Sequence, residues 1–229
     1  ATMTHRERVL RTLNHQEPDR VPLDLGCSRS TSIVVQAYER LNRHLGSQEP
    51  PRIFSKWLNI SHPSQAMLAR FDIDTRSVSQ SSPDNWQDIV FPDGSYQDEW
   101  GVVRSRPAGC LYYDLTKSPL AGDVDVSDLE KLRWPDPHDP GRCRGLAEEA
   151  KRLHAGTDFA IALNMPGGIV TQAQFMRGFE DWFADLIADP TFYHALMEKI
   201  TDLWIEMARD ELDAVGDNLD LCFFGDDVA

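Results

Sequence analysis

Two short apolar runs, separated by amphipathic segments, constrain the fold of this chain more than any other feature. Residues 159–164 are apolar up to a final asparagine, as expected of a strand buried on both faces of a parallel sheet. Residues 219–224 form a second strand candidate. Between them, residues 175–187 and the segment that begins at Asp189 and Pro190 carry apolar side chains at helical spacing. Strands that alternate with helices in this way predict a parallel sheet with crossover helices.

The first part of the chain repeats this alternation with shorter elements. Thr4 and Glu7 form a capping box, which predicts a helix that opens the chain, and Met3 is the expected natural start. Further strands are predicted at 21–26 and 73–78, and further helices at 32–45, 63–70 and around 146–153. These make about four strand–helix units, whereas a closed (β/α)₈ barrel typically needs about 250 residues. Either the sheet is open, or the chain holds the first part of a barrel whose exposed edge needs a partner.

Residues 86–120 interrupt this scheme as an insertion. Residues 89–91 and 96–103 flank a turn built on Asp93 and Gly94, which is typical of a β-hairpin. Residues 111–113 are a candidate for a third strand.

Composition narrows the function classes. The chain has 37 acidic and 23 basic side chains, a formal net charge of −14, which argues against a nucleic-acid partner. No apolar stretch approaches the roughly 18 residues that cross a bilayer, and the N-terminus has no signal-like apolar core. The four cysteines show no metal-ligand spacing and are read as reduced thiols of a cytoplasmic protein, with Cys27 and Cys222 in the core.

Chemistry in barrel-like sheets lies at the carboxyl ends of strands, and this selects a few polar residues. Asp226 and Asp227 directly follow the last strand, so they suit metal binding, orientation of a substrate hydroxyl, or general acid catalysis if each raises the other's pKa. The same pattern is also typical of a helix N-cap. Arg29 suits an acidic substrate group, and Asn164 opens a segment that includes Gly167 and Gly168, where backbone can approach a ligand.

Eight short motifs lie in order along nearly the whole chain. They are residues 4–10 (THRERVL), 17–22 (EPDRVP), 93–95 (DGS), 98–101 (DEWG), 118–120 (SPL), 134–137 (WPDP), 177–180 (RGFE) and 225–227 (GDD). Together they resemble uroporphyrinogen decarboxylase-like proteins, and most of all the bacterial branch near the corrinoid-linked methyltransferases and O-demethylases. The resemblance implies a (β/α)₈ barrel, of which residues 1–229 correspond to the N-terminal two-thirds as one domain truncated on its C-terminal side.

The resemblance does not extend to the site of the decarboxylase itself. The two arginines that hold its substrate carboxylates correspond to Cys27 and Thr31, and Arg29 between them would serve one acidic group at most. The family's aspartate falls near Ser81, its tyrosine near Gln174 and its serine near Asp226. A polycarboxylate needs clustered arginines. We therefore expect Arg29, Ser81, Asn164 and Gln174 to contact a different small-molecule substrate, with Asp226 and Asp227 as the catalytic pair.

The expected function is methyl transfer or O-demethylation linked to a corrinoid protein. Zinc and a corrinoid are implied by the resemblance alone, because the zinc ligands of that branch lie in later strands that are not in this sequence. Three alternatives stay open: a porphyrinogen decarboxylase (a carbon–carbon lyase), an open α/β domain of other function, and a non-catalytic half-barrel module. Such a module would close its sheet with another chain or a second copy, as a homo-oligomer.

Overall fold

The computed structural model describes residues 3–165 and 167–227 and separates the chain into two compact units. The first unit comprises residues 1–80, 144–165 and 212–223, and the second comprises 81–143, 166–211 and 224–229. Each unit is assembled from segments far apart in the sequence. The prediction of one domain over 1–229 with an insertion at 86–120 stays a prediction. None of the helices in the described residues has both the length and the apolar character needed to span a membrane.

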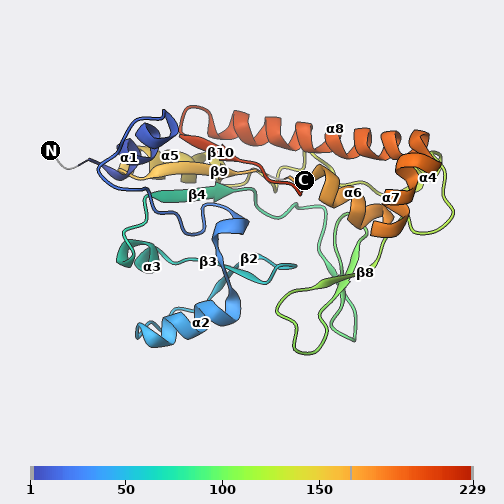
Figure 1. Ribbon diagram of the computed structural model, residues 1–229, viewed down its shortest axis with the longest axis horizontal. Coiled ribbons are helices and arrows are strands. Elements are labelled where there is room, and N and C mark those ends of the chain that lie inside the picture. The colour runs from blue at the N-terminus through green and yellow to red at the C-terminus, as the bar shows by residue number, and fades with distance from the viewer. Residues whose placement is uncertain (1–2, 166, 228–229) are drawn as a thin grey trace. The chain divides into compact units, whose positions relative to one another are not determined.

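The first unit contains a parallel sheet of three strands in the order β10 (Leu221–Phe223), β9 (Ala160–Asn164), β4 (Thr75–Ser79) (Figure 1). Every residue of β9 is buried, because β4 and β10 pair with its two edges and helices pack against it. α5 (Leu146–Gly156) contacts β4 and β9 and buries Leu146, Ala150 and Leu153. The predicted mixed α/β fold with a parallel sheet is confirmed, and within the described residues this sheet does not close into a barrel.

Several predicted elements of this unit are wrong in detail. The strand expected at 21–26 does not form, because the backbone N–H of Leu23 donates to the Asp74 carboxylate instead of to a neighbouring strand. Cys222 was expected in the core but is exposed, because β10 is an edge strand of its sheet. The helix expected from residue 32 starts later, as α2 (Val35–His44), because Ile33 and Val34 form β1.

A second, antiparallel sheet in this unit was not predicted. Its order is β1 (Ile33–Val34), β3 (Ile60–His62), β2 (Arg52–Ser55). These strands are too short to show a period along the sequence. The predicted helix that follows is confirmed as α3 (Gln65–Arg70), with Ser64 accepting from the N–H of Met67. A short 3₁₀ helix, Arg29–Thr31, precedes β1.

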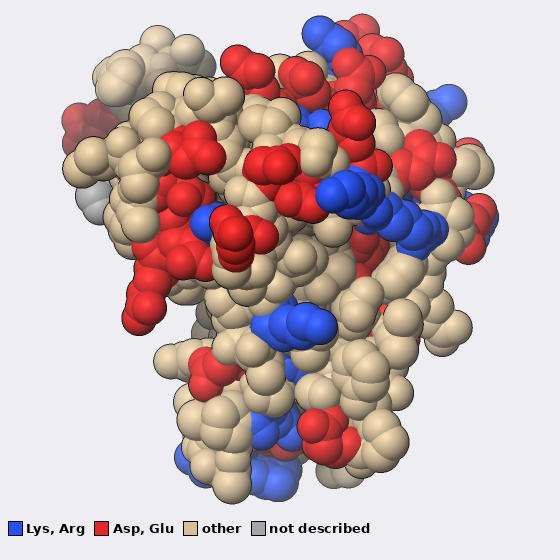
Figure 2. Space-filling model, turned by 90° about the vertical axis from the view of Figure 1, so that its right-hand side faces the viewer, with Lys and Arg blue, Asp and Glu red and all other residues tan. Residues whose placement is uncertain are grey.

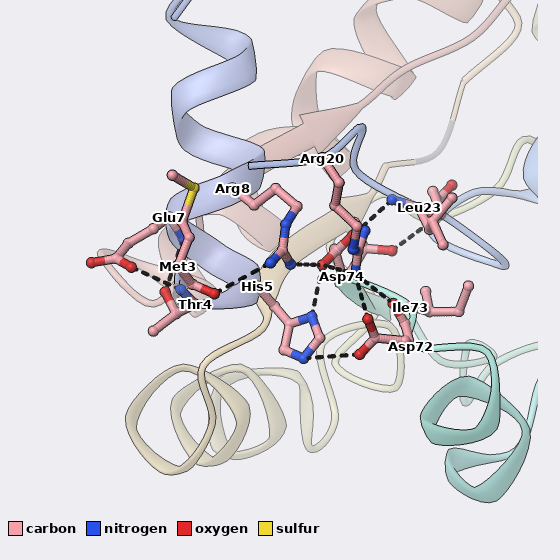
Figure 3. Close-up of polar contacts among 12 residues, drawn as sticks. Met3, Thr4, His5, Glu7, Arg8, Arg20, Leu23, Asp72, Ile73 and Asp74 are labelled. Atoms are coloured by element: carbon pink, nitrogen blue, oxygen red, sulfur yellow. Dashed lines mark hydrogen bonds and ion pairs between the residues drawn. The ribbon is translucent and has the colours of Figure 1, made fainter. Parts of the chain in front are cut away.

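The N-terminal motifs meet at one buried carboxylate, that of Asp74, immediately before β4 (Figure 3). Arg8, on α1 (His5–Leu13), lies 2.5 Å from Asp74 through Nη1, and Arg20 lies 2.6 Å from it through its own Nη1. His5 Nδ1 lies 2.7 Å from Asp74, and the N–H of Leu23 donates to it at 2.7 Å. Although burial raises the pKa of Asp74, these partners outweigh it and lower the pKa to about 2. The N-terminal motifs therefore hold the segment that leads into β4.

The second unit contains a four-stranded antiparallel meander. Gly94 takes the left-handed conformation, with φ of 82°, in the hairpin turn. The hairpin turn is confirmed, but the strand expected over 96–103 is divided by a second turn, in which the N–H of Gly101 donates to the carbonyl of Asp98. The strand expected at 111–113 lies a few residues later, at 114–117. The order of the strands is β5 (Ile89–Val90), β6 (Tyr96–Gln97), β7 (Val103–Ser105), β8 (Asp114–Lys117).

The helices of this unit depart from prediction at one glycine. The helix expected over 175–187 is divided into α6 (Ile169–Arg177) and α7 (Phe179–Ala188) by Gly178, whose φ of 93° is outside the helical region. The long helix α8 (Pro190–Val215) follows, and Asp189 accepts from the N–H of Phe192 as predicted for its N-cap. A short helix, α4 (Asp128–Lys131), lies before the WPDP motif at 134–137.

Buried arginines connect four of the remaining motifs in two pairs. Arg142 binds Glu99 of the DEWG motif at 2.5 Å and donates to the carbonyl of Asp136 in the WPDP motif. Arg177 of the RGFE motif donates to the carbonyl of Leu120 in the SPL motif at 2.6 Å and binds Asp185 at 2.7 Å. Hydrogen bonds to buried charged groups are among the stronger ones. These motifs therefore fix the fold of the second unit.

Candidate functional site

The carboxyl edge of the parallel sheet in the first unit is formed by Ser79, Asn164 and Phe223, which are register partners across the three strands. Directly paired residues of a parallel sheet point to the same side, and the side alternates along each strand. Thr75, Ser77 and Ser79 therefore share a face with Asn164 and with the alanines at 160 and 162. The interior of a barrel is usually filled by bulky branched side chains. Small and polar residues here leave room for a ligand.

A cavity of about 370 Å³ lies on this face of the sheet. That volume is at the lower end of the range for sites that hold small organic molecules. Its polar groups include Asp24, whose carboxylate accepts from the Thr75 hydroxyl and, at 3.2 Å, from the N–H of Cys27. None of the described residues that line it is Lys, Arg or His. They are Val9, Thr12, Leu13, Val21, Pro22, Leu23, Asp24, Cys27, Ser28, Thr31, Thr75, Leu221, Cys222 and Phe223.

Two of the predicted substrate-binding residues lie in this unit. Asn164 ends β9 and is 7% exposed, and its side-chain Oδ1 has no hydrogen-bond partner within the described part of the chain. Arg29 is half-buried in the 3₁₀ helix, and burial lowers the pKa of its guanidinium. Cys27 is buried as expected, and burial raises the pKa of its thiol to about 12, so it is not a thiolate at neutral pH.

The other predicted residues lie in the second unit. Asp226 is half-buried and Asp227 is exposed, and the N–H of Asp227 donates to Asp226 Oδ1 at 3.0 Å. Ser81 is exposed, and its N–H donates to the carbonyl of Arg142. Gln174 is buried on α6. The roles assigned to these residues from the sequence stay predictions.

The carboxylate of Asp226 caps α6 from a distant segment of the chain. Gly168 occupies the N-cap position and has no side chain to accept from the first turn. Asp226 accepts instead from the N–H groups of Val170 at 2.7 Å and Thr171 at 3.1 Å, and from the Thr171 hydroxyl at 2.8 Å. Burial raises the pKa of Asp226, but these hydrogen bonds outweigh it and the pKa is lowered. The expected upward shift toward a general acid is therefore wrong for Asp226, and the helix-cap interpretation fits its contacts.

Substitution of Asp226 distinguishes a helix-capping role of its carboxylate from a catalytic one. We expect Asp226→Ala to lower the free energy of unfolding by about 1–2 kcal/mol, the usual loss for an N-cap. Asp226→Asn should lose less, because its amide oxygen still accepts from the first turn. Chemical denaturation of both variants measures this difference. If the Asn variant keeps its stability but loses turnover, the carboxylate is catalytic; if turnover follows the folded fraction in both, Asp226 is only a cap.

No group of three His, Cys, Asp or Glu side chains within the described residues is placed to hold a metal ion. The donor set present therefore does not fit the zinc site that the family resemblance implies. Two buried groups were missed by sequence reasoning. The burial and ion pairs of Asp74 could not be predicted, because its partners are distant in sequence. Glu211, on α8, is 1% exposed, and neither of its carboxylate oxygens has a hydrogen-bond partner in the described chain.

The uroporphyrinogen decarboxylase (URO-D) family model matches residues 116–221. This confirms the resemblance indicated by the motifs. No curated protein sequence matches.

A solved structure of a methyltransferase from Methanosarcina mazei is also similar, with a TM-score of 0.51 and 18% sequence identity. The alignment covers 98% of this chain and 59% of the methyltransferase. The likeness shows a common fold, and the chain spans 59% of the length of that methyltransferase.

Proposed function

We propose that this chain carries the substrate-binding part of a URO-D-superfamily enzyme that removes a methyl group from a small methylated compound, by O-demethylation linked to a corrinoid protein. The parallel sheet would then belong to a (β/α)₈ barrel, of which the chain supplies about the first four units. The fold it shares with a methyltransferase supports this proposal.

The observation that carries the proposal is the lining of the cavity in the first unit. Its described lining residues carry one carboxylate, that of Asp24, and no cationic group. A ligand with several carboxylates would meet an uncompensated negative charge there, at a cost that grows as water is excluded. Arg29, just outside this lining, would hold one acidic group at most. A small, largely uncharged compound suits the cavity better than a porphyrinogen.

The charge of the surface also favours an uncharged substrate over a polyanionic one. Figure 2 shows acidic side chains crowded over the upper half of one face, with few lysines and arginines among them. Together with the net charge of −14, this disfavours polyanionic substrates and nucleic acid.

A binding experiment tests the proposal. We expect ligand-detected NMR to show binding of 2-methoxyphenol and not of benzene-1,3,5-tricarboxylate, because only the former suits a cavity without cations. Leu23→Trp should fill the cavity and weaken binding several-fold. Ile53→Trp, at an exposed position of β2 outside the cavity, is the matched control. Formation of catechol with cob(I)alamin as methyl acceptor then tests the reaction; preferential binding of the tricarboxylate would contradict the proposal.

A second candidate, an assembly module, is favoured by the open edge of the sheet. In the described residues β10 pairs on one side only, and nearby Val21 is 77% exposed. Unpaired strand edges bind other strands. Sedimentation velocity over a hundredfold concentration range tests this candidate, and a monomer at every concentration would count against self-association.

A further inference from the structure

We propose that Asn164 determines substrate specificity by accepting a hydrogen bond from an O–H or N–H group of the bound molecule. This inference rests on the proposed function and deepens it, because it assigns the substrate a second chemical feature besides its methyl group. The substrate class is then a small methylated compound that also carries a free hydroxyl or N–H.

The first support is the free-energy cost of burying the side-chain carbonyl of Asn164 without a hydrogen bond. Its Oδ1 is buried and has no partner among the described residues. A buried carbonyl without a hydrogen bond is destabilising, and native proteins rarely keep one without a reason. A leucine or valine at the end of a fully buried strand would avoid this penalty. A ligand donor that meets Oδ1 would remove it.

The second support is the direction of the side chain. Asn164 is the register partner of Phe223, which lines the cavity. It also shares a face with Ala160, whose register partner Thr75 lines the same cavity. Because side chains alternate across a strand with a period of two, Asn164 lies on the same face of the sheet as Thr75 and Phe223. It is not itself a lining residue of the cavity but is the direct neighbour of one, Phe223, at the carboxyl edge. Ligands of parallel α/β sheets bind at this edge.

The chemistry of the amide sets the kind of group it recognises. A carbonyl oxygen only accepts hydrogen bonds, so an ether oxygen cannot pair with it, whereas a hydroxyl or N–H can. A site built around a buried polar group rejects an analogue that lacks the matching group, because the protein atom is then left unpaired. Since the amide does not titrate, the preference for a ligand with a donor group over an analogue without one should be the same at pH 6 and pH 8.

Two probes that differ by one donor test the inference. 2-Methoxyphenol carries a methoxy group and a hydroxyl, and 1,2-dimethoxybenzene replaces that hydroxyl by a second methoxy group. We expect the protein to bind 2-methoxyphenol about tenfold more tightly, the effect of one hydrogen bond, by NMR or calorimetric titration. In Asn164→Leu the two affinities should become equal, and the melting temperature should rise because the unpaired carbonyl is gone.

Two further variants control for folding and for neighbouring groups. Asn164→Asp keeps an acceptor and should keep the preference, and Ser79→Ala, at the register partner on β4, should keep it too. Equal affinities in the unaltered protein, or a preference that survives in Asn164→Leu, would overturn the role of Asn164 while leaving small-ligand binding intact. If neither probe binds, the proposed function fails and this inference fails with it.

Discussion

Asp74→Asn is expected to be the most damaging single substitution in this protein. It should lower the free energy of unfolding by about 3–5 kcal/mol, the usual result of removing one partner from a buried ion pair. The Asp74 side chain is fully buried and receives Arg8 and Arg20 on its two oxygens, so the amide would leave buried guanidinium charge without its counter-ion. Urea denaturation at pH 7 measures the loss.

The same carboxylate predicts how stability changes with acid. Its pKa is about 2 in the folded protein against an ordinary value of 3.8, so the unfolded chain takes up a proton first as the pH falls. The contribution of this ionisation, roughly 2 kcal/mol, is complete above pH 4 and is lost as the pH falls from 4 to 2. Asp74→Asn should flatten the stability curve over that window.

Asp19→Asn is the matched control, because Asp19 also binds Arg8 but is partly exposed to solvent. Its loss should be much smaller, since exposed pairs are screened by water and salt. Similar losses in the two variants would show that the buried carboxylate is not the centre of this network.

Glu211→Gln is expected to stabilise the protein. Glu211 is buried on α8 without a hydrogen-bond partner in the described residues, and burial raises its pKa to about 8, a shift that the nearby Arg142 only partly opposes. In the unfolded chain the group ionises near 4.5, so the folded state holds a proton that the unfolded state has lost. Stability therefore falls as the pH rises from 4.5 to 8, by roughly 3 kcal/mol at pH 7.

The amide cannot ionise, so Glu211→Gln should remove this pH dependence. Thermal unfolding of the two proteins should coincide near pH 4 and separate progressively up to pH 8, with the variant melting higher. Asp213→Asn, at an exposed position of the same helix, is the control and should produce no such divergence. Parallel curves for Glu211→Gln and the unaltered protein would mean that Glu211 is charged or solvated in the fold.

The candidate site was predicted in part. The sequence places Asn164 correctly at the carboxyl edge of a buried parallel strand, because a continuous apolar run that ends in a polar residue is a local pattern. It could not reveal that Oδ1 lacks a partner, since this depends on every neighbour in space. The prediction that the pKa of Asp226 is raised is wrong because it too depends on a partner that is distant in sequence. Its helix partner, Val170, lies 56 residues earlier in the chain.

Local chemistry is what the sequence by itself determined. The capping box of Thr4 and Glu7, the N-cap at Asp189 and the Gly94 turn all form as predicted, because each involves groups within a few residues of one another. The tertiary structure alone decided which charges are buried, which strand is an edge and where a cavity opens. Arg8 reaches Asp74 across 66 residues, and Cys222 is exposed on β10, an edge strand of the described sheet. Those outcomes depend on long-range packing, which no short window of sequence contains.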